Sequence, residues 1–363
     1  MGPLASLRIV EFAGIGPGPF CAMLLADLGA DVVRIERPGG GGGGPTLAPE
    51  LDLLNRNKRS VVLDLKSPAG VETALRLVER ADALIEGYRP GVMERLGLGP
   101  DACLARNSRL IYGRMTGWGQ DGPLAPRAGH DIDYVALSGT LHAIGRRGGP
   151  PVLPLNLVGD FGGGSLYLAV GLLAAIVEAG RSGQGQVVDA AILDGVLSLS
   201  TPFFGLMHGG LWRERRGTNL LDGGCPWYDV YETADGAHVA IGPIEPQFFA
   251  QFVAALDLGD DVPAQWDFAR WPELRERIAA RIGTRTRAEW EAVFADSDAC
   301  VAPVLTWREA MAHPHLQARG SFATLDGIAQ PVPAPRFSRT PAALRHGPHQ
   351  PGADTEEVLG EWG

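Results

Sequence analysis

The sequence is short of lysine and of positive charge, and both shortages exclude classes of ligand. Lys58 and Lys66 are the only lysines among 32 basic residues, and 42 acidic residues bring the formal net charge to −10. A surface with this excess of negative charge is unsuited to binding nucleic acid or an anionic membrane. An anionic ligand must therefore be bound by a few local arginines.

Cysteine is scarce as well, and its placement excludes two kinds of fold. The four cysteines form neither a metal-ligand spacing nor a disulfide framework: Cys21, Cys103, Cys225 and Cys300. Thiols scattered in this way suit a reducing compartment. We expect no metal site.

Long apolar runs are missing too. Residues 161–177 are the longest uncharged stretch in the middle of the chain, and they fall short of the roughly 20 residues that a transmembrane helix needs. We interpret them as a buried helix. The strand-like run at 7–12 begins too early for a signal peptide, and the final Glu-Trp-Gly is not a peroxisomal signal of the Ser-Lys-Leu type. We therefore expect a cytoplasmic protein.

The first third of the chain has a regular alternation of strand-like and helix-like patterns. Apolar runs predict strands at 8–12, 31–35, 60–65, 83–85 and 110–115, and helical patterns occur at 19–28, 68–80 and 100–106. Such alternation is typical of right-handed βαβ units, so we predict an α/β fold with a parallel sheet flanked by helices. The apolar residues 187–212 are interpreted as further helix.

A smaller domain of mixed character is predicted after residue 218. Two strand-like runs flank a tight turn at 234–236, and helical patterns follow at 246–256, 271–280 and 287–294. Thr286 with Glu289, and Thr306 with Glu309, have the spacing of capping boxes. Two domains suit a chain of 363 residues. We expect a large α/β domain at 1–218, to which 330–363 return, and a small α+β domain with its linkers at 219–329.

Two glycine-rich segments have more than one interpretation. The turn at 14–19 follows the first strand and Glu36 ends the second, as in a dinucleotide-binding fold. Pro19 stands where the third glycine of that fingerprint belongs, so a tight turn that feeds a helix is the simpler explanation. The glycine tract at 39–44 predicts a mobile surface loop.

Ionisable residues gather at two expected helix starts. His130 and Asp131 precede one helical pattern, and Asp160 precedes the apolar run at 166–177. A helix N-terminus has spare N–H groups and a partial positive charge, so it can hold an oxyanion and keep a nearby histidine neutral. The simpler alternative is that both aspartates are N-caps and that His130 is a structural histidine.

Four motifs together carry a resemblance to a known family. They are GHDIDY at 129–134, NLVGDFGG at 156–163, NLLDGG at 219–224 and IEPQF at 244–248. On these motifs, and from residue 7 to about 340, the chain resembles the racemase branch of the family III CoA-transferase superfamily. The resemblance implies an enzyme that interconverts (R)- and (S)-2-methylacyl-CoA thioesters. It also implies a homodimer of two interlocked chains, with each active site between the large domain of one and the small domain of the other.

The resemblance assigns catalytic residues by their positions. His130 and Asp160 correspond to two acid/bases that exchange the C2 proton on opposite faces through an enolate. Backbone N–H groups at the Asp131 helix start would stabilise the enolate oxygen. Glu245 corresponds to a residue that assists the histidine, and Asn156 is placed to hold the Asp160 carboxylate.

The resemblance also implies contacts to coenzyme A, which is part of the substrate, and no separate cofactor is expected. Arg37 corresponds to a CoA-binding arginine and Arg89 to a further phosphate contact, because guanidinium groups bind phosphate in a bidentate fork. Arg56, Lys58 and Arg59 are left open as further phosphate contacts. The other expected CoA-binding residues are Val62, Leu63, Asp64, Leu65, Ala128, Gly129, Ile132 and Asp133.

Other functions stay open on sequence alone. A CoA-transferase of the same superfamily uses the aspartate at position 160 as a nucleophile, whereas His130 and Glu245 favour the racemase. A non-catalytic acyl-CoA-binding protein and a nicotinamide oxidoreductase are further alternatives. A requirement for a carboxylic acid as second substrate distinguishes the transferase from the racemase.

Overall fold

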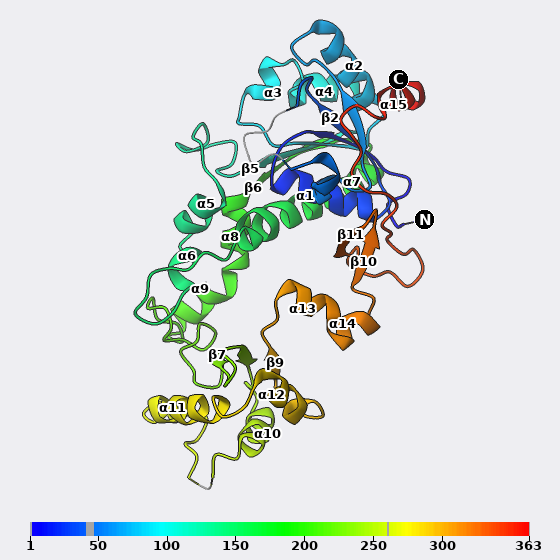
Figure 1. The fold of residues 1–363 in the computed structure, drawn as a ribbon. Coiled ribbons are helices and arrows are strands. Elements are labelled where there is room, and N and C mark those ends of the chain that lie inside the picture. The colour runs from blue at the N-terminus through cyan, green and yellow to red at the C-terminus, as the bar shows by residue number, and fades with distance from the viewer. Residues whose placement is uncertain (1, 41–46, 260, 363) are drawn as a thin grey trace. The chain divides into compact units, whose positions relative to one another are not determined.

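The computed structural model describes residues 2–40, 47–259 and 261–362 (Figure 1). The chain forms two compact units. The first holds the chain up to Thr140, Pro154–Thr201 and the chain from His315 on, and the second holds Leu141–Leu153 and Pro202–Pro314. The second unit thus begins and ends earlier than the range 219–329 expected from the sequence. Most of the glycine tract at 39–44 lies outside the described residues.

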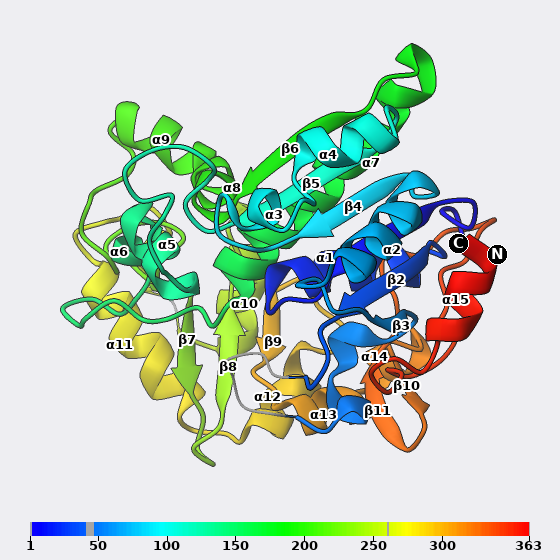
Figure 2. The same ribbon diagram turned by 90° about the horizontal axis from the view of Figure 1, so that it is seen from above.

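The first unit is built on a parallel sheet of six strands in the order β3-β2-β1-β4-β5-β6 (Figure 2). Every pair of neighbouring strands in it is parallel, so the predicted α/β fold with a parallel sheet is confirmed. The strands are β1 (Arg8–Phe12), β2 (Asp31–Glu36), β3 (Arg59–Val62), β4 (Ala83–Glu86), β5 (Ile111–Thr116) and β6 (Gln186–Ala191).

Helices cover both faces of this sheet. Figure 1 shows α2, α3, α4 and α15 on one face and α1 and α7 on the other. Alternation along β1 buries Val10 and Phe12 in the core beneath α2 and α15, and the alternate residues Ile9 and Glu11 are buried as well. The helices are α1 (Pro17–Asp27), α2 (Pro68–Glu79), α3 (Val92–Arg95), α4 (Pro100–Arg106), α7 (Leu166–Ser182) and α15 (Thr355–Trp362).

Two predictions about the middle of the chain are wrong. Residues 187–212 were expected to be helical throughout, but β6 comes first, followed by α8 (Ile192–Leu199) and α9 (Thr201–His208). Asp160 does not start an α-helix. It lies within a π-helix, η3 (Leu157–Ser165), that runs directly into α7. The third strand, expected at 60–65, also ends early at Val62.

The π-helix packs closely against α8. A Cβ at Gly163 would lie 2.7 Å from the side chain of Val196, and a Cβ at Gly195 would overlap the carbonyl oxygen of Gly163. Only glycine lets η3 and α8 approach so closely. The glycine-rich motif is therefore a packing surface that holds an unusually wide helix against α8.

The continuous helical segment Leu157–Ser182 is longer than the uncharged stretch at 161–177 from which a helix was predicted. It has 26 residues, and an 18-residue window within it has a mean hydropathy of 1.6, so the segment is long and apolar enough to cross a membrane by length and composition. In the first unit α7 packs on β5 and β6 and buries Leu168 and Leu172. Val170 and Val177 on its other face are exposed. The predicted burial therefore holds for the side of the helix that faces the sheet, and the opposite side is exposed in the single chain.

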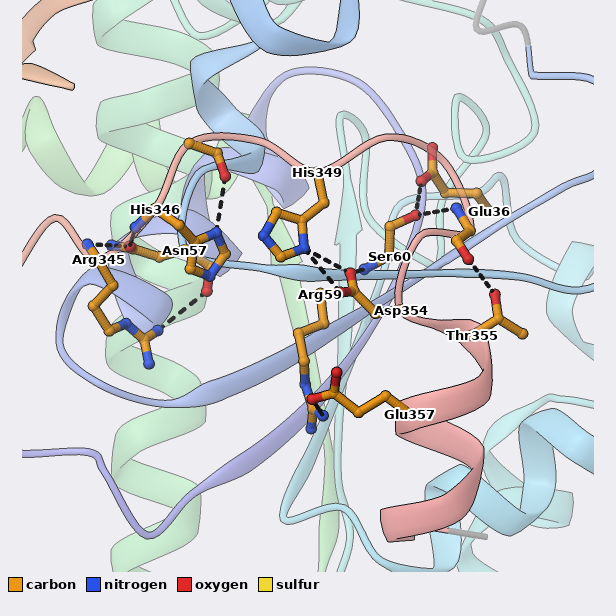
Figure 3. Close-up of polar contacts among 12 residues, drawn as sticks. Glu36, Asn57, Arg59, Ser60, Arg345, His346, His349, Asp354, Thr355 and Glu357 are labelled. Atoms are coloured by element: carbon orange, nitrogen blue, oxygen red, sulfur yellow. Dashed lines mark hydrogen bonds and ion pairs between the residues drawn. The ribbon is translucent and has the colours of Figure 1, made fainter. Parts of the chain in front are cut away.

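The C-terminal segment covers the open edge of β3. The carboxylate of Asp354 accepts the N–H of Ser60 at 2.7 Å (Figure 3), and the hydroxyl of Thr355 accepts the N–H of Val62 at 3.3 Å. Asn57 accepts the N–H of Arg345 at 2.7 Å. The bonds to Ser60 and Val62 satisfy donors that an edge strand otherwise leaves unpaired. The hairpin of β10 (Phe322–Leu325) and β11 (Ile328–Pro331) belongs to the same unit.

The second unit is a small α+β assembly. A three-stranded antiparallel sheet in the order β7-β8-β9 packs with helices around Trp227 and Trp290, both fully buried. Both predicted capping boxes, Thr286 with Glu289 and Thr306 with Glu309, are confirmed. The main elements are β7 (Asp229–Glu232), β8 (His238–Ile241), β9 (Val301–Pro303), α10 (Pro246–Leu256), α11 (Trp271–Ile282), α12 (Arg287–Phe294) and α13 (Trp307–Ala312).

Candidate active site

The expected helix start at His130 is present. The helix α5 spans Asp131–Leu137, and His130 is its N-cap, with extended backbone and an exposed side chain. The carboxylate of Asp133 accepts the N–H of His130 at 2.9 Å, which fixes the backbone from which the imidazole projects. The ring of Tyr134 packs edge-on against Trp118, with 4.6 Å between ring centroids, and anchors the first turn of α5.

A hydrogen bond connects this helix start with the segment that carries Asp160. Oδ1 of Asp131 accepts the backbone N–H of Asp160 at 2.7 Å. The N–H of Gly159 also acts on the Asp131 carboxylate and lowers its pKa, while burial raises it. The residue that follows His130 in the chain is therefore bonded to the backbone of Asp160, and the two candidate acid/bases belong to one local assembly.

The glycine turn after β1 forms another wall of this assembly. Gly16 has φ 68°, and a Cβ at this position would lie 3.0 Å from Oδ2 of Asp160. The buried Ser165 hydroxyl donates to the carbonyl oxygens of Pro17 at 2.7 Å and of Asp160 at 3.0 Å. Phe20 stacks on Phe161 with ring centroids 4.4 Å apart. The turn is thus packed directly against the Asp160 carboxylate.

The surroundings of Asp160 change its acidity. Burial raises the pKa of Asp160 to about 6, and the negative charge of Asp131 acts in the same direction. A hydrogen bond from Asn156 and the charge of His130 lower the pKa and offset part of this increase. A carboxyl group with this pKa exchanges its proton readily near neutral pH, as an acid/base catalyst must.

The candidate phosphate-binding arginines lie at the carboxyl ends of parallel strands. Arg37 follows β2 directly and Arg89 follows β4, and both side chains are exposed. The carboxyl ends of parallel strands form one edge of a sheet, which is where open α/β folds bind ligands. Both arginines are therefore available to an anionic ligand at this edge.

The other expected CoA-binding residues have mixed surroundings. Asp64 is exposed after β3, whereas Leu63 is buried in the core, and Leu65 packs against it. Ala128 is exposed and its carbonyl oxygen accepts the Trp118 indole N–H at 3.5 Å. Four further positions surround the edge strand or the start of α5: Val62, Gly129, Ile132 and Asp133.

The basic residues at 56–59 are engaged inside the protein. Lys58 is buried and its ammonium group lies 2.6 Å from Glu11. Arg56 is buried and bonded to Asp27 at 2.6 Å, and Arg59 bonds Asp31 at 2.5 Å. All three cations are thus paired with acidic side chains of the protein and have a structural role. We therefore no longer expect them to contact phosphate.

The dinucleotide interpretation of the glycine turn also loses its support. The N-terminus of α1, where a pyrophosphate would bind, faces the Asp160 carboxylate across Gly16. The Glu36 carboxylate forms an ion pair with Arg34 at 2.6 Å and accepts the hydroxyl of Ser60. Both groups that a nucleotide would use are thus bonded to, or packed against, other parts of the protein.

Glu245 lies in the second unit. It is the N-cap of α10 and its side chain is exposed. In the motif at 219–224 of the same unit, the carboxylate of Asp222 accepts the N–H of Gly217 at 2.9 Å and that of Asn219 at 2.7 Å. Arg275 donates to the carbonyl oxygen of Gly223 at 2.8 Å. This motif is thus stabilised by its own hydrogen bonds.

Over the described ranges no three His, Cys, Asp or Glu side chains come together as a metal site.

Sequence reasoning missed two contributors to the site. Gly16 was interpreted only as part of a turn, and Ser165 was not considered at all. The positive φ of Gly16 is visible only in the structure, and the Ser165 bonds join segments about 150 residues apart in the chain. The glycines around Asp160 were the available signal, because close backbone approach requires them.

The fold and the site together define an α/β protein with a candidate acid–base pair at a parallel sheet. The chain belongs to CoA-transferase family III, which matches residues 4–355. Alpha-methylacyl-CoA racemase of Mus musculus is 47% identical over 99% of this chain and 93% of that protein, and its Homo sapiens counterpart is 45% identical with the same coverage.

More distant relatives include a CoA-transferase. The succinyl-CoA–L-malate CoA-transferase beta subunit of Chloroflexus aurantiacus is 33% identical over 99% of this chain and 94% of that protein. Among solved structures, a CAIB/BAIF family protein from Brucella suis has a TM-score of 0.86 at 25% identity and covers 100% of both chains. The family therefore contains both chemistries that the sequence left open.

Proposed function

We propose that this protein is a racemase that interconverts the (R)- and (S)-epimers of 2-methylacyl-CoA thioesters. The supporting observation is that Asp160, with a pKa raised to about 6, is bonded through Asp131 to the helix start that carries His130. The identity of 45–47% with alpha-methylacyl-CoA racemases over nearly the whole chain agrees with this activity.

The chemistry requires two acid/bases and a site for negative charge. A hydrogen alpha to a thioester carbonyl is far less acidic than a side chain, so its removal needs stabilisation of the enolate oxygen as well as a base. His130 removes the proton from one face of C2 while Asp160 returns a proton to the other, and the roles reverse in the opposite direction. Backbone N–H groups at the start of α5 stabilise the enolate oxygen.

Both protonation states must be accessible to the same enzyme. In one form Asp160 carries the exchangeable proton and His130 is neutral, and in the other the proton is on His130. A pKa of about 6 for Asp160 lets this carboxyl group take up and release its proton near neutral pH. This property favours proton exchange over a nucleophilic role, for which Asp160 need only be ionised.

Coenzyme A is bound at the sheet edge in this proposal. The exposed Arg37 and Arg89 contact its phosphates, which places the thioester toward His130 and Asp160. The acyl chain extends over the exposed apolar residues next to this pair, Ile132 on α5 and Leu157 on η3. Arginine contacts to the nucleotide contribute binding energy without taking part in proton transfer.

The protein acts as a homodimer of interlocked chains in this proposal, with Glu245 of the partner assisting His130. Leu166, Val170 and Val177 lie on one face of α7 and are 49%, 66% and 57% exposed. An apolar stripe of this kind on a helix of a water-soluble protein is suited to burial against a second copy of the chain.

The activity is tested by incubating a single 2-methylacyl-CoA epimer with the protein in heavy water. We expect conversion toward a near-equal mixture of epimers and deuterium at C2. The competing CoA-transferase requires a carboxylic acid acceptor and leaves C2 unlabelled. Transfer of CoA to added carboxylate, with no deuterium at C2, would overturn the racemase and establish Asp160 as a nucleophile.

A further inference from the structure

We infer that the side chain of Asp131 is the positioning residue of the active site: it caps the π-helix that carries Asp160 and supplies a negative charge beside it. The inference rests on the proposed racemase function and adds a separate task for this carboxylate. His130 is held at the start of α5 and Asp160 within η3, and Asp131 is the residue bonded to both segments.

The geometry follows from the hydrogen bonding of a π-helix. Each N–H in such a helix bonds a carbonyl five residues earlier, so the first five N–H groups have no partner within it. In η3 the first bond of this type runs from the N–H of Phe161 to the carbonyl of Asn156 at 3.2 Å. The N–H groups of Gly159 and Asp160 precede it. That of Asp160 donates to the Asp131 carboxylate at 2.7 Å, and that of Gly159 acts on the same carboxylate to lower its pKa.

The sequence around Asp160 is adapted to this contact. A Cβ at Gly159 would overlap Oδ1 of Asp131 and would also lie 2.9 Å from the side chain of Val135. Any residue other than glycine would push η3 away from α5. The buried Gly159 and the half-buried Asp131 therefore hold Asp160 at a fixed distance from the segment that carries His130.

The charge of Asp131 has a consequence distinct from its hydrogen bonds. The titratable groups that act on Asp160 are Asp131 and His130, both from the α5 segment, and Tyr134 of α5 also interacts with it electrostatically. On the α1 side Asp160 faces Gly16, which carries no charge. A negative charge at Asp131 makes Asp160 hold its proton more tightly. Asp131 thus influences both the position and the protonation of Asp160.

Two substitutions separate these tasks. Asp131→Asn keeps Oδ1 as an acceptor for the backbone and removes the charge, whereas Asp131→Ala removes both. Asp194→Asn is the matched control, because Asp194 is an exposed carboxylate in the first turn of α8, which packs on the same π-helix. The measurements are kcat and KM for each 2-methylacyl-CoA epimer, and the pH profile of kcat/KM for the epimer whose C2 hydrogen faces Asp160, because ionised Asp160 is the base for that epimer.

The account predicts a distinct result for each variant. In Asp131→Ala, kcat should fall about 10- to 100-fold with little change in KM, because Asp160 is misplaced while the CoA contacts remain. In Asp131→Asn, kcat at the optimum should stay within a few fold of the wild type. Its acid limb should move to lower pH by about one unit, because a neighbouring negative charge is gone. Asp194→Asn should match the wild type in both respects.

The outcomes decide the inference separately from the proposed function. A wild-type protein that neither converts epimers nor exchanges C2 hydrogen refutes the racemase. An active wild type whose Asp131→Ala variant keeps normal kcat refutes the positioning role. If Asp131→Ala does not fold, as judged by circular dichroism, the acid limb of Asp131→Asn decides. An acid limb unchanged from that of the wild type overturns the inference.

Discussion

Gly16 and Asp160 approach so closely that a single methyl group would disturb them. A Cβ at Gly16 would lie 3.0 Å from Oδ2 of Asp160, and the backbone of Gly16 has φ 68°. The turn after β1 therefore lies against a side-chain carboxylate, at the position where the corresponding turn of a nucleotide-binding fold lies against a phosphate.

Gly16→Ala should damage activity more than stability alone explains. The positive φ costs about 1–3 kcal/mol for a residue with a Cβ, and the added methyl group presses on the Asp160 carboxylate. Gly183→Ala is the matched control, because Gly183 has φ 77° at the end of α7 and its Cβ would meet only the end of the Arg109 side chain at 3.6 Å. We expect both variants to unfold at lower temperature, but only Gly16→Ala to lose kcat. Equal kcat in the two variants contradicts this view.

Local signals in the sequence predicted much of the fold. Five of the six parallel strands were predicted from apolar runs bounded by turns, and the capping boxes at Thr286 and Thr306 were read from spacings of three residues. The strand β6 was missed because its residues continue into the apolar α8 without a break. The pattern of one segment cannot show that it adds a strand to a distant sheet edge.

The acid/base residues of the site could be predicted from the sequence. The packing and ion pairs that hold them in place were harder to predict. His130 and Asp160 were singled out by the motifs around them, and the helix start at Asp131 is where it was predicted. The π-helix around Asp160 depends on Gly163 meeting Gly195, a tertiary contact with no local signal. The structural roles of Lys58 and Arg59 depend on acidic partners far away in the chain.

Arg37→Ala should weaken binding of the substrate while leaving the chemical step largely intact. Loss of a charged hydrogen bond to phosphate costs about 1.5–3 kcal/mol, which appears as a higher KM or Kd for acyl-CoA. Arg76→Ala is the control, because Arg76 is an exposed arginine on α2. Binding can be measured by calorimetry with CoA and with CoA that lacks the 3′-phosphate. Unchanged affinity in Arg37→Ala would show that other residues hold the nucleotide.

Asp160→Asn should make the protein more stable at pH 8 although it abolishes turnover. Burial raises the pKa of Asp160 to about 6, above the value of about 3.9 in an unfolded chain. The folded state therefore binds the proton more tightly, and this group's contribution to stability is lost as the pH rises from about 4 through 6. Because the side chain is partly exposed, we expect a gain of about 1–2 kcal/mol at pH 8.

The pH dependence separates this effect from a general change in packing. The stability gain of Asp160→Asn should shrink below pH 6 and disappear near pH 4, where wild-type Asp160 is protonated. Asp194→Asn, which removes an exposed carboxylate, should show no comparable trend. Denaturant unfolding at several pH values provides the test. A gain of the same size at pH 4 and at pH 8 would contradict the raised pKa.

Co-expression of two inactive chains tests the shared active site. In the proposed dimer each site takes His130 from one chain and Glu245 from its partner. A heterodimer of His130→Ala and Glu245→Ala chains, purified with two different tags, then contains one intact site and one doubly mutated site. We expect activity near half that of the wild-type dimer, and far above either homodimer. If each site lies within one chain, no activity returns.

The assignment of two bases on opposite faces of C2 is tested most directly by hydrogen exchange in the separate variants His130→Ala and Asp160→Ala. Each variant is first checked for fold by circular dichroism and for binding of CoA. Each pure epimer is then incubated in heavy water, and deuterium at C2 and configuration are followed together. We predict that net epimerisation collapses in both variants. His130→Ala should exchange, with retention, only the epimer whose hydrogen faces Asp160, and Asp160→Ala only the other epimer. Near-normal epimerisation in both folded variants, or exchange of the same epimer by both, would contradict the account.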